Sequence, residues 1–208
     1  MERREALKNI GFGSAALFTS SMLFGALQGC SSAPTVDWVP TFFTPEEAAQ
    51  LEKICEGICP PTTTPGAVEA GVPNYLDQSM KVIEKHPEAD HFRKGMAVFV
   101  ENFDKNQPVK FNKATNEQVT TAINEYYKKY DSDPSILKSY RESASDKAGE
   151  KSAQFLETHF VTQVVDSTFY AYFTSELVGE TVMPYDPIPV QYQGCLPLEP
   201  GQMSWSNV

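Results

Sequence analysis

Basic residues are scarce in this sequence. Of its 208 residues, 17 are Lys or Arg and 27 are Asp or Glu, so the formal net charge at pH 7 is −10. A protein that binds nucleic acid needs a basic surface to displace counterions from the phosphates, so this composition argues against a nucleic-acid partner. Hydrophobic residues make up 41% of the chain, which is typical of globular domains and excludes wholesale disorder.

Histidine is also scarce, and the common catalytic motifs are missing. The three histidines are His86, His91 and His159. His86 and His91 are five residues apart, whereas two ligands on one helix face are three or four residues apart. His159 lies beside Phe160 in a predicted helix, where packing or solvent contact is the simpler interpretation. Because no H-E-x-x-H, G-x-S-x-G or P-loop motif occurs, we expect no catalytic, cofactor-binding or metal-binding residues in this chain.

The chain does have an apolar leader. A short basic start precedes an uncharged run over residues 10–27, and this combination is typical of a secretory signal. The Gly and Ser content of the run makes it a weak membrane span. Gly11, Gly13 and Ala16 fit the dinucleotide fingerprint, but that motif functions only between a strand and a helix. We therefore reject a nucleotide site here.

Two patterns in the leader indicate its destination. Arg3, Arg4, Leu7 and Lys8 match R-R-x-x-L-K, the twin-arginine address for export of folded proteins; an ordinary positive start is the alternative. Leu27-Gln28-Gly29-Cys30 is similar to a bacterial lipobox, whose cysteine carries a diacylglycerol. We predict a signal peptide over 1–29, a lipidated tether over 30–40 that begins at Cys30, and one helical domain over 41–208. The lipid would hold this domain on the periplasmic side of a bacterial membrane.

Only three cysteines remain once Cys30 is lipidated. Cys55 and Cys59 lie one predicted helical turn apart, a separation that a disulfide can bridge. The C-x-x-C-H pattern of haem attachment is absent. Three thiols are an odd number, so in an oxidising compartment one of them is free, buried or bonded to another chain. Core packing for Cys55 and interchain pairing for Cys195 both stay open.

Prolines, capping residues and apolar spacing divide the mature chain into helices. Thr44 to Glu47 form a capping box with Pro45 at the first helical position, and prolines end this helix at residue 60. Further helices are predicted from Pro73, after Pro87, after Thr115 and over about 150–176, with at most a short helix within 131–151. Since strand alternation is scarce, the sequence predicts an all-α bundle of five or six helices.

The residues after 179 are predicted to form a long irregular arm. They contain five prolines and many apolar residues, so they cannot form a helix. Backbone groups without a regular partner must be satisfied elsewhere. The arm therefore either wraps its own bundle alone or also covers a partner, and the residues favour both interpretations equally.

Motifs at both ends of the domain carry a resemblance to a known family. Near the start they are Leu51-x-x-Ile54-Cys55-Glu56-x-Ile58-x-Pro60 and Thr64-Pro65-Gly66-Ala67-x-x-Ala70-Gly71-Val72-Pro73. Near the end they are Tyr172-Phe173-Thr174-Ser175-Glu176-Leu177-x-Gly179 and Tyr185-Asp186-Pro187-x-Pro189-x-x-Tyr192-x-Gly194-Cys195-x-Pro197. Together they resemble gluconate 2-dehydrogenase subunit 3 proteins. Cys59, where an aliphatic residue is expected, and Val190, where glycine is more usual, depart from the pattern.

The resemblance implies a small non-catalytic subunit beside a large FAD-dependent dehydrogenase of the glucose–methanol–choline type. That partner would oxidise a sugar or sugar acid and pass electrons to a cytochrome c or another carrier, with the FAD in the partner and no cofactor in this chain. The small subunit would carry the folded partner through twin-arginine export. The expected partner interface consists of irregular, family-like positions: Pro65, Gly66, Val72, Pro73, Tyr185, Pro187, Pro189, Tyr192 and Cys195.

Two other functions stay open at this point. A stand-alone ligand-binding lipoprotein would use Tyr126, Tyr127 and Tyr130, although their spacing also suits core packing. A small redox enzyme would use Cys55 and Cys59.

Overall fold

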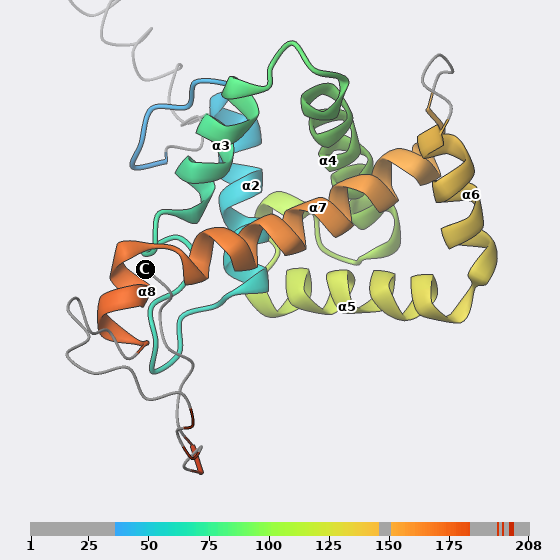
Figure 1. Ribbon diagram of the computed structural model, residues 1–208. Coiled ribbons are helices and arrows are strands. Elements are labelled where there is room, and N and C mark those ends of the chain that lie inside the picture. The colour runs from blue at the N-terminus through green and yellow to red at the C-terminus, as the bar shows by residue number, and fades with distance from the viewer. Residues whose placement is uncertain (1–35, 146–150, 184–194, 196, 198–199, 202–208) are drawn as a thin grey trace, which may run out of the picture. The chain divides into compact units, whose positions relative to one another are not determined.

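The computed structural model describes residues 36–145, 151–183, 195, 197 and 200–201. The chain divides into two units, residues 1–35 and 36–208, and all described residues belong to the second (Figure 1). Its elements are α2 (Pro45–Ile58), α3 (Val72–Val82), α4 (Pro87–Asn106), the 3-10 turn η1 (Phe111–Lys113), α5 (Asn116–Ser132), α6 (Pro134–Ser145), α7 (Ala153–Phe173) and α8 (Glu176–Thr181). The described residues contain no strand, and the predicted all-α class is confirmed.

Two of these helices begin at capping boxes that the sequence predicts. The Thr44 hydroxyl accepts a hydrogen bond from the Glu47 backbone N–H, and the Glu47 carboxylate accepts one from the Thr44 N–H. Thr115 and Gln118 repeat this exchange at α5. Each cap satisfies backbone donors that have no partner within the helix and contributes about 1 kcal/mol.

The structure corrects the predicted helices in two places. α6 is a full helix where at most a short one is expected, because Ile136 is buried and Tyr140, one turn on, stacks on Phe155 of α7. The long helix ends at Phe173, and a separate α8 begins where the Ser175 hydroxyl accepts a hydrogen bond from the Val178 N–H. The described residues therefore hold seven α-helices.

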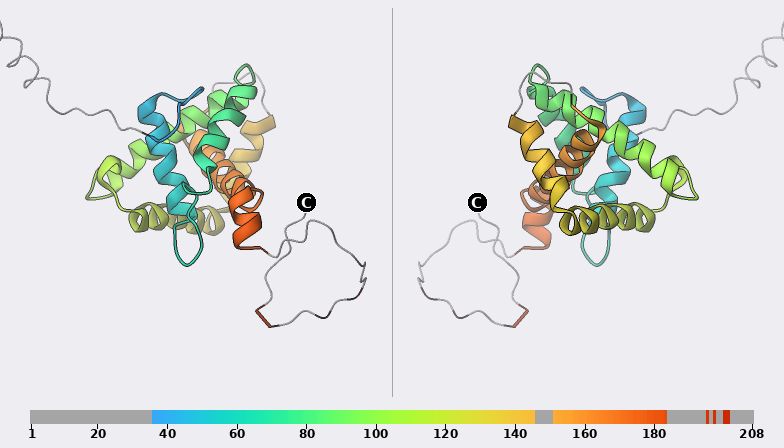
Figure 2. Two further views of the ribbon diagram at one scale, coloured as in Figure 1. Left: turned by 90° about the vertical axis from the view of Figure 1, so that its left-hand side faces the viewer. Right: turned by 90° about the vertical axis from the view of Figure 1, so that its right-hand side faces the viewer.

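α7 is the central helix of this unit. It packs against α2, α3, α4 and α6, while α5 packs on α2, and the two side views of Figure 2 show these helices around it. Four consecutive residues of α7, from Thr158 to Val161, are buried. A helix buried on several sides loses the single apolar stripe of a surface helix.

Among the described helices, α4 and α7 form the most extensive contact of the core. The periodicity after Pro87 predicts an apolar face on α4, and its members Phe92, Met96, Phe99 and Phe103 are all buried. The rings of Phe92 and Phe160 meet edge to face, with centroids 5.0 Å apart. None of the helices in the described ranges combines the length and apolar character needed to cross a bilayer.

Candidate functional site

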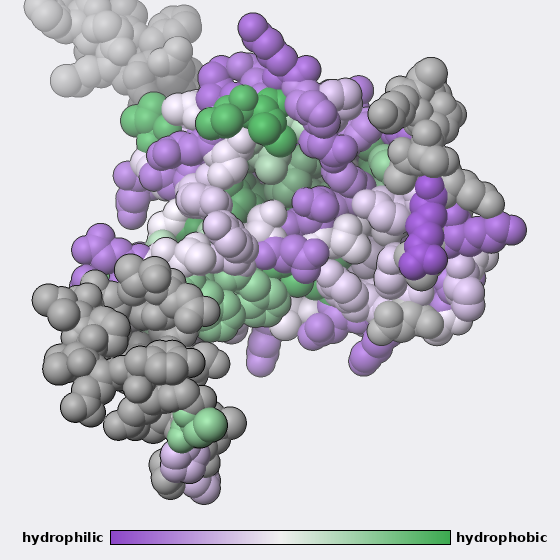
Figure 3. All heavy atoms as spheres, in the orientation of Figure 1, coloured by the Kyte–Doolittle hydropathy of each residue, from purple (hydrophilic) through white to green (hydrophobic). Residues whose placement is uncertain are grey.

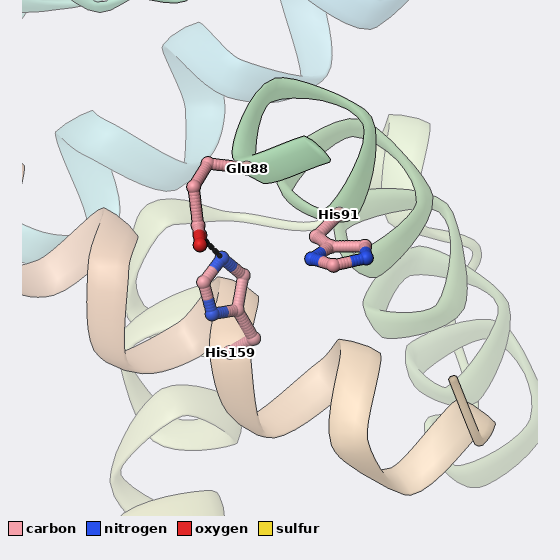
Figure 4. Close-up of side chains that lie close together, drawn as sticks. All are labelled: Glu88, His91 and His159. Carbon is pink, nitrogen blue, oxygen red and sulfur yellow. Dashed lines mark ion pairs between the residues drawn. The ribbon is translucent and has the colours of Figure 1, made fainter. Parts of the chain in front are cut away.

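Glu88, His91 and His159 form a compact cluster between α4 and α7 (Figure 4). Glu88 and His91 lie one turn apart at the start of α4, and His159 faces them from α7. The Nε2 atom of His159 lies 3.0 Å from Oε2 of Glu88. The rings of His91 and His159 are nearly perpendicular, with centroids 5.8 Å apart. One donor atom from each of the three side chains lies within 4.8 Å of the other two.

The ring of His159 is held by its surroundings. It is only 6% exposed and stacks on Phe155, with centroids 5.8 Å apart. Its Nδ1 atom lies 3.3 Å from the Tyr140 hydroxyl, so Nε2 is the atom turned toward Glu88. Burial lowers the pKa of His159, the Glu88 carboxylate opposes this and His91 adds to it. The net lowering favours the neutral imidazole, which has a lone pair available on one nitrogen.

The sequence contains one pattern that indicates this cluster, the pair Glu88 and His91, which the spacing between His86 and His91 does not reveal. Glu88-x-x-His91 places a carboxylate and an imidazole on one helix face, and this i, i+3 pair binds metals in helical bundles. His159 is 68 residues beyond His91 in the chain, so its approach depends on how α4 packs on α7. His86 instead caps α4, where its Nδ1 atom accepts a hydrogen bond from the Glu88 N–H.

A second feature is an aromatic face on α3 and α7, formed by Tyr75, Phe169, Tyr170 and Phe173. These side chains are between 43% and 62% exposed. Tyr75 pairs with Tyr170 across the two helices, and Phe169 stacks on Phe173, with ring centroids 6.4 Å and 6.3 Å apart. Figure 3 shows hydrophobic surface beside the C-terminal half of α7. Exposed aromatic clusters are typical of protein–protein interfaces.

The sequence also carries a signal for the aromatic face. Four of the five residues from Phe169 to Phe173 are aromatic. Successive residues of a helix point about 100° apart, so such a run cannot bury every ring on one side. Tyr172 is buried, whereas the rings of Phe169, Tyr170 and Phe173 are exposed.

The loop between α2 and α3 is fastened by residues on both sides of it. The Glu56 carboxylate accepts a hydrogen bond from the Val68 N–H at 2.9 Å and lies so close to Gly66 that a Cβ there would be 2.7 Å from Oε1. The Tyr172 hydroxyl donates to the Pro65 carbonyl at 2.7 Å. Glu56 belongs to the family-like motif over residues 51–60, and Pro65 and Gly66 belong to the motif over residues 64–73. The contacts of this loop therefore join the two motifs near the start of the domain.

Residues 45–191, well over half of the chain, match the profile of a family described as Gluconate 2-dehydrogenase subunit 3. The chain belongs to the gluconate 2-dehydrogenase subunit 3 family. No curated protein and no solved structure matches it. The family is named for the third subunit of a dehydrogenase, which indicates that this subunit 3 protein is an accessory subunit of a larger gluconate dehydrogenase complex.

The structure places three positions of the expected partner interface in the interior of this subunit. Gly66, Val72 and Pro73 are buried, so their side of the contact is taken up by the fold itself. Pro65 is half-buried and Cys195 is exposed. The other expected positions lie outside the described residues: Tyr185, Pro187, Pro189 and Tyr192.

The three cysteines that the structure describes, Cys55, Cys59 and Cys195, are free thiols, so no disulfide joins any two of them within the chain. Cys55 is fully buried, and its Sγ atom lies 3.6 Å from the Thr168 hydroxyl. Burial raises the pKa of Cys55 to about 12 and that of Cys59 to about 11. Because the thiolate is the reactive form, these values disfavour the redox-enzyme hypothesis.

Within the described part of the chain, the hollow beside Tyr126 of α5 is smaller than a typical ligand site. The Tyr126 hydroxyl hydrogen-bonds to Thr158, and burial raises the pKa of Tyr126 to about 12. The hollow beside it has a volume of about 190 Å³, below the ~300–1,000 Å³ of typical small-molecule sites. Tyr127 packs partly buried against the core, as does Tyr126, so this geometry favours core packing over ligand binding.

Proposed function

We propose that this subunit is the non-catalytic escort and anchor of a large FAD-dependent dehydrogenase that oxidises a sugar or sugar acid. The complex would stand on the periplasmic side of a bacterial membrane, with a cytochrome c or another carrier receiving its electrons. The family match over residues 45–191 carries this proposal. The leader with Arg3, Arg4 and Cys30 supports export and anchoring, and the aromatic face supports docking of the partner.

The aromatic face is well suited to bind a large subunit. Its rings belong to two packed helices, so they lose little conformational freedom when a partner covers them. Buried aromatic anchors commonly dominate binding energy at protein interfaces. A hollow of about 290 Å³, lined by Tyr75, Tyr170, Leu76 and Met80 among others, gives a partner side chain a place to insert.

The double variant Tyr170→Ser/Phe173→Ser tests this docking. Two aromatic anchors at about 1–2 kcal/mol each amount to a roughly 30- to 1,000-fold loss of affinity. We therefore expect at least about tenfold less flavin-bearing large chain to co-purify with a tagged subunit from solubilised membranes. Flavin absorbance per tagged chain is the measurement.

Val39→Ser is the matched control, because Val39 is 84% exposed but lies outside the aromatic face. It should leave co-purification unchanged. Equal flavin recovery with the double variant and the wild type would place the interface elsewhere on the subunit. If no flavin-bearing chain co-purifies with the wild type, the proposed function itself is wrong.

The conservative double variant Arg3→Lys/Arg4→Lys tests the escort role. It preserves the positive charge of the leader, so a general secretory signal would tolerate it, whereas the twin-arginine route requires the arginine pair. We expect dehydrogenase activity to move almost wholly from the membrane and periplasmic fractions to the cytoplasm. Activity assays on separated fractions measure this.

Cys30→Ser separates anchoring from export in the same experiment. It should abolish incorporation of labelled palmitate, and Cys195→Ser, the matched control, should retain the label. Normal delivery of the large subunit in cells that carry Arg3→Lys/Arg4→Lys would refute the escort role.

A further inference from the structure

The cluster of Glu88, His91 and His159 has no part in the function proposed above. His159 precedes Tyr170 by eleven residues on α7, which corresponds to about 16 Å along the helix axis. The cluster therefore belongs to a different part of the subunit from the aromatic face. Its three side chains come from two helices and meet at one point (Figure 4).

The chemistry of the three side chains is that of a transition-metal site. Two imidazoles and one carboxylate are the protein ligands of many catalytic-type zinc sites, which leave the fourth position to water. The same donor set suits other divalent first-row ions. Each side chain here offers an atom with a free lone pair when His159 and His91 are neutral.

The distances fit such an ion after a small movement of one side chain. A tetrahedral ion with ligand bonds of about 2.0–2.1 Å separates its ligand atoms by about 3.3 Å. The His159 Nε2 and Glu88 Oε2 atoms already lie 3.0 Å apart. The widest separation in the cluster is within 4.8 Å, so His91, which is only partly buried, has about 1.5 Å to close by side-chain rotation.

The surroundings of His159 resemble the outer shell of a metal ligand. A metal-bound histidine usually hydrogen-bonds through its second ring nitrogen, which fixes the tautomer and the direction of the ring. The Nδ1 atom of His159 has this contact with the Tyr140 hydroxyl at 3.3 Å. Stacking on Phe155 further restricts the ring. This ligand is thus oriented before any ion arrives, while Glu88 and His91 at the surface are free to adjust.

We propose that Glu88, His91 and His159 bind one divalent transition-metal ion of the zinc class, with water at the remaining position. The ion would tie the first turn of α4 to the N-terminal half of α7. Because Glu88 is about half exposed, the ion has a direct path from solvent. Its role is to fasten these two helices.

Zinc titration of the purified full-length protein, prepared with a tag that contains no histidine, tests the proposal. Calorimetry should show one Zn²⁺ per chain with a dissociation constant in the micromolar range or tighter. Glu88→Gln and His91→Gln should each weaken binding at least tenfold. Both positions lie at the surface end of the cluster, so their circular dichroism spectra should match that of the wild type.

Asp90→Asn is the matched control, because it also removes one carboxylate from the first turn of α4 but lies outside the cluster. It should bind zinc as the wild type does. Cobalt should give the intense visible bands of a four-coordinate ion in the wild type and lose them in His91→Gln. Less than one zinc per chain in the wild type, or an affinity in Glu88→Gln and His91→Gln equal to that of the wild type, would show that the cluster is only a polar contact between two helices.

Discussion

Replacing Gly95 with alanine is expected to lower the free energy of unfolding by about 2 kcal/mol or more. A Cβ atom at this position of α4 would lie 2.3 Å from the Leu156 carbonyl oxygen and 2.6 Å from the Phe160 Cβ, both on α7. These atoms belong to the backbone or are fixed to it, so no side-chain rotation relieves the clash. Overpacking of this kind costs about 1–3 kcal/mol and occasionally more. Urea unfolding followed by circular dichroism measures the change.

Gly179→Ala is the matched control for this prediction. Gly179 is also helical, but a Cβ there would meet no atom of the described residues within 4 Å. Alanine is intrinsically better than glycine in a helix by about 1 kcal/mol, so this variant should be as stable as the wild type or slightly more stable. Similar stability of the two variants would mean that α4 and α7 are not in close contact at Gly95.

The close contact at Gly95 also explains how the metal cluster is assembled. Glu88, His91 and Gly95 follow one another at spacings of three and four, so they share one face of α4. On α7, a Cβ at Gly95 would meet Leu156 and Phe160, and His159 lies between these two residues in the sequence. With no side chain at Gly95, α7 approaches closely enough for His159 to reach Glu88. One glycine thus determines both the tightest core contact and the geometry of the cluster.

Much of the fold could be predicted because its signals are local. The boxes at Thr44 and Thr115 and the proline at the start of α4 each mark a helix start in adjacent residues, and all three are confirmed. The apolar spacing from Phe92 to Phe103 likewise predicts the buried face of α4. The family followed from motifs of the same local kind, and the profile match confirms it.

What could not be predicted depends on contacts between distant segments. α6 has few apolar residues, and its helix is stabilised by Tyr140 and Ile136 packing on other elements. Gly66 lies in an irregular, Pro- and Gly-rich loop of the sequence, whereas in the structure it is buried beside the Glu56 carboxylate. His159 joins Glu88 only because two helices cross. Residue type alone does not distinguish a buried loop from an interface.

No pattern in the sequence indicates the role of Asp77. Its replacement by asparagine should lower the free energy of unfolding by about 2–4 kcal/mol. Its carboxylate is fully buried in α3. One oxygen accepts the Thr41 N–H and hydroxyl at 2.7 and 2.6 Å, and the other accepts the N–H groups of Phe42 and Phe43 at 3.0 and 2.9 Å. Asparagine offers one acceptor oxygen and turns an NH₂ group toward donors, which leaves buried N–H groups unpaired at about 1–3 kcal/mol each.

These hydrogen bonds fasten the segment that leads from the proposed lipid anchor into the helices. Thr41, Phe42 and Phe43 follow the predicted tether over 30–40 directly, so Asp77 holds the first residues of the predicted helical domain. The Arg93 guanidinium lies 4.3 Å from the centre of the Phe42 ring and donates to the Phe42 carbonyl. The segment is therefore held from α3 and from α4. Asp166→Asn, at an exposed position of α7, is the control and should leave stability unchanged.

The pH dependence of the loss of stability in Asp77→Asn shows whether the negative charge of the carboxylate stabilises the fold. Burial by itself raises the pKa of Asp77, but the hydrogen bonds from Phe43, Thr41 and Phe42 together outweigh it, so the net pKa lies below the usual value. A group with a depressed pKa in the folded state stabilises fully above its unfolded pKa, about 3.9, and loses that contribution as the pH falls through the folded value. Urea unfolding at pH 7 and at steps below pH 4 should therefore show the gap between wild type and Asp77→Asn narrowing toward acid, because the wild-type carboxyl becomes neutral there too. A gap of constant size over that range would mean that Asp77 is already protonated at neutral pH and that shape alone, not charge, holds the segment.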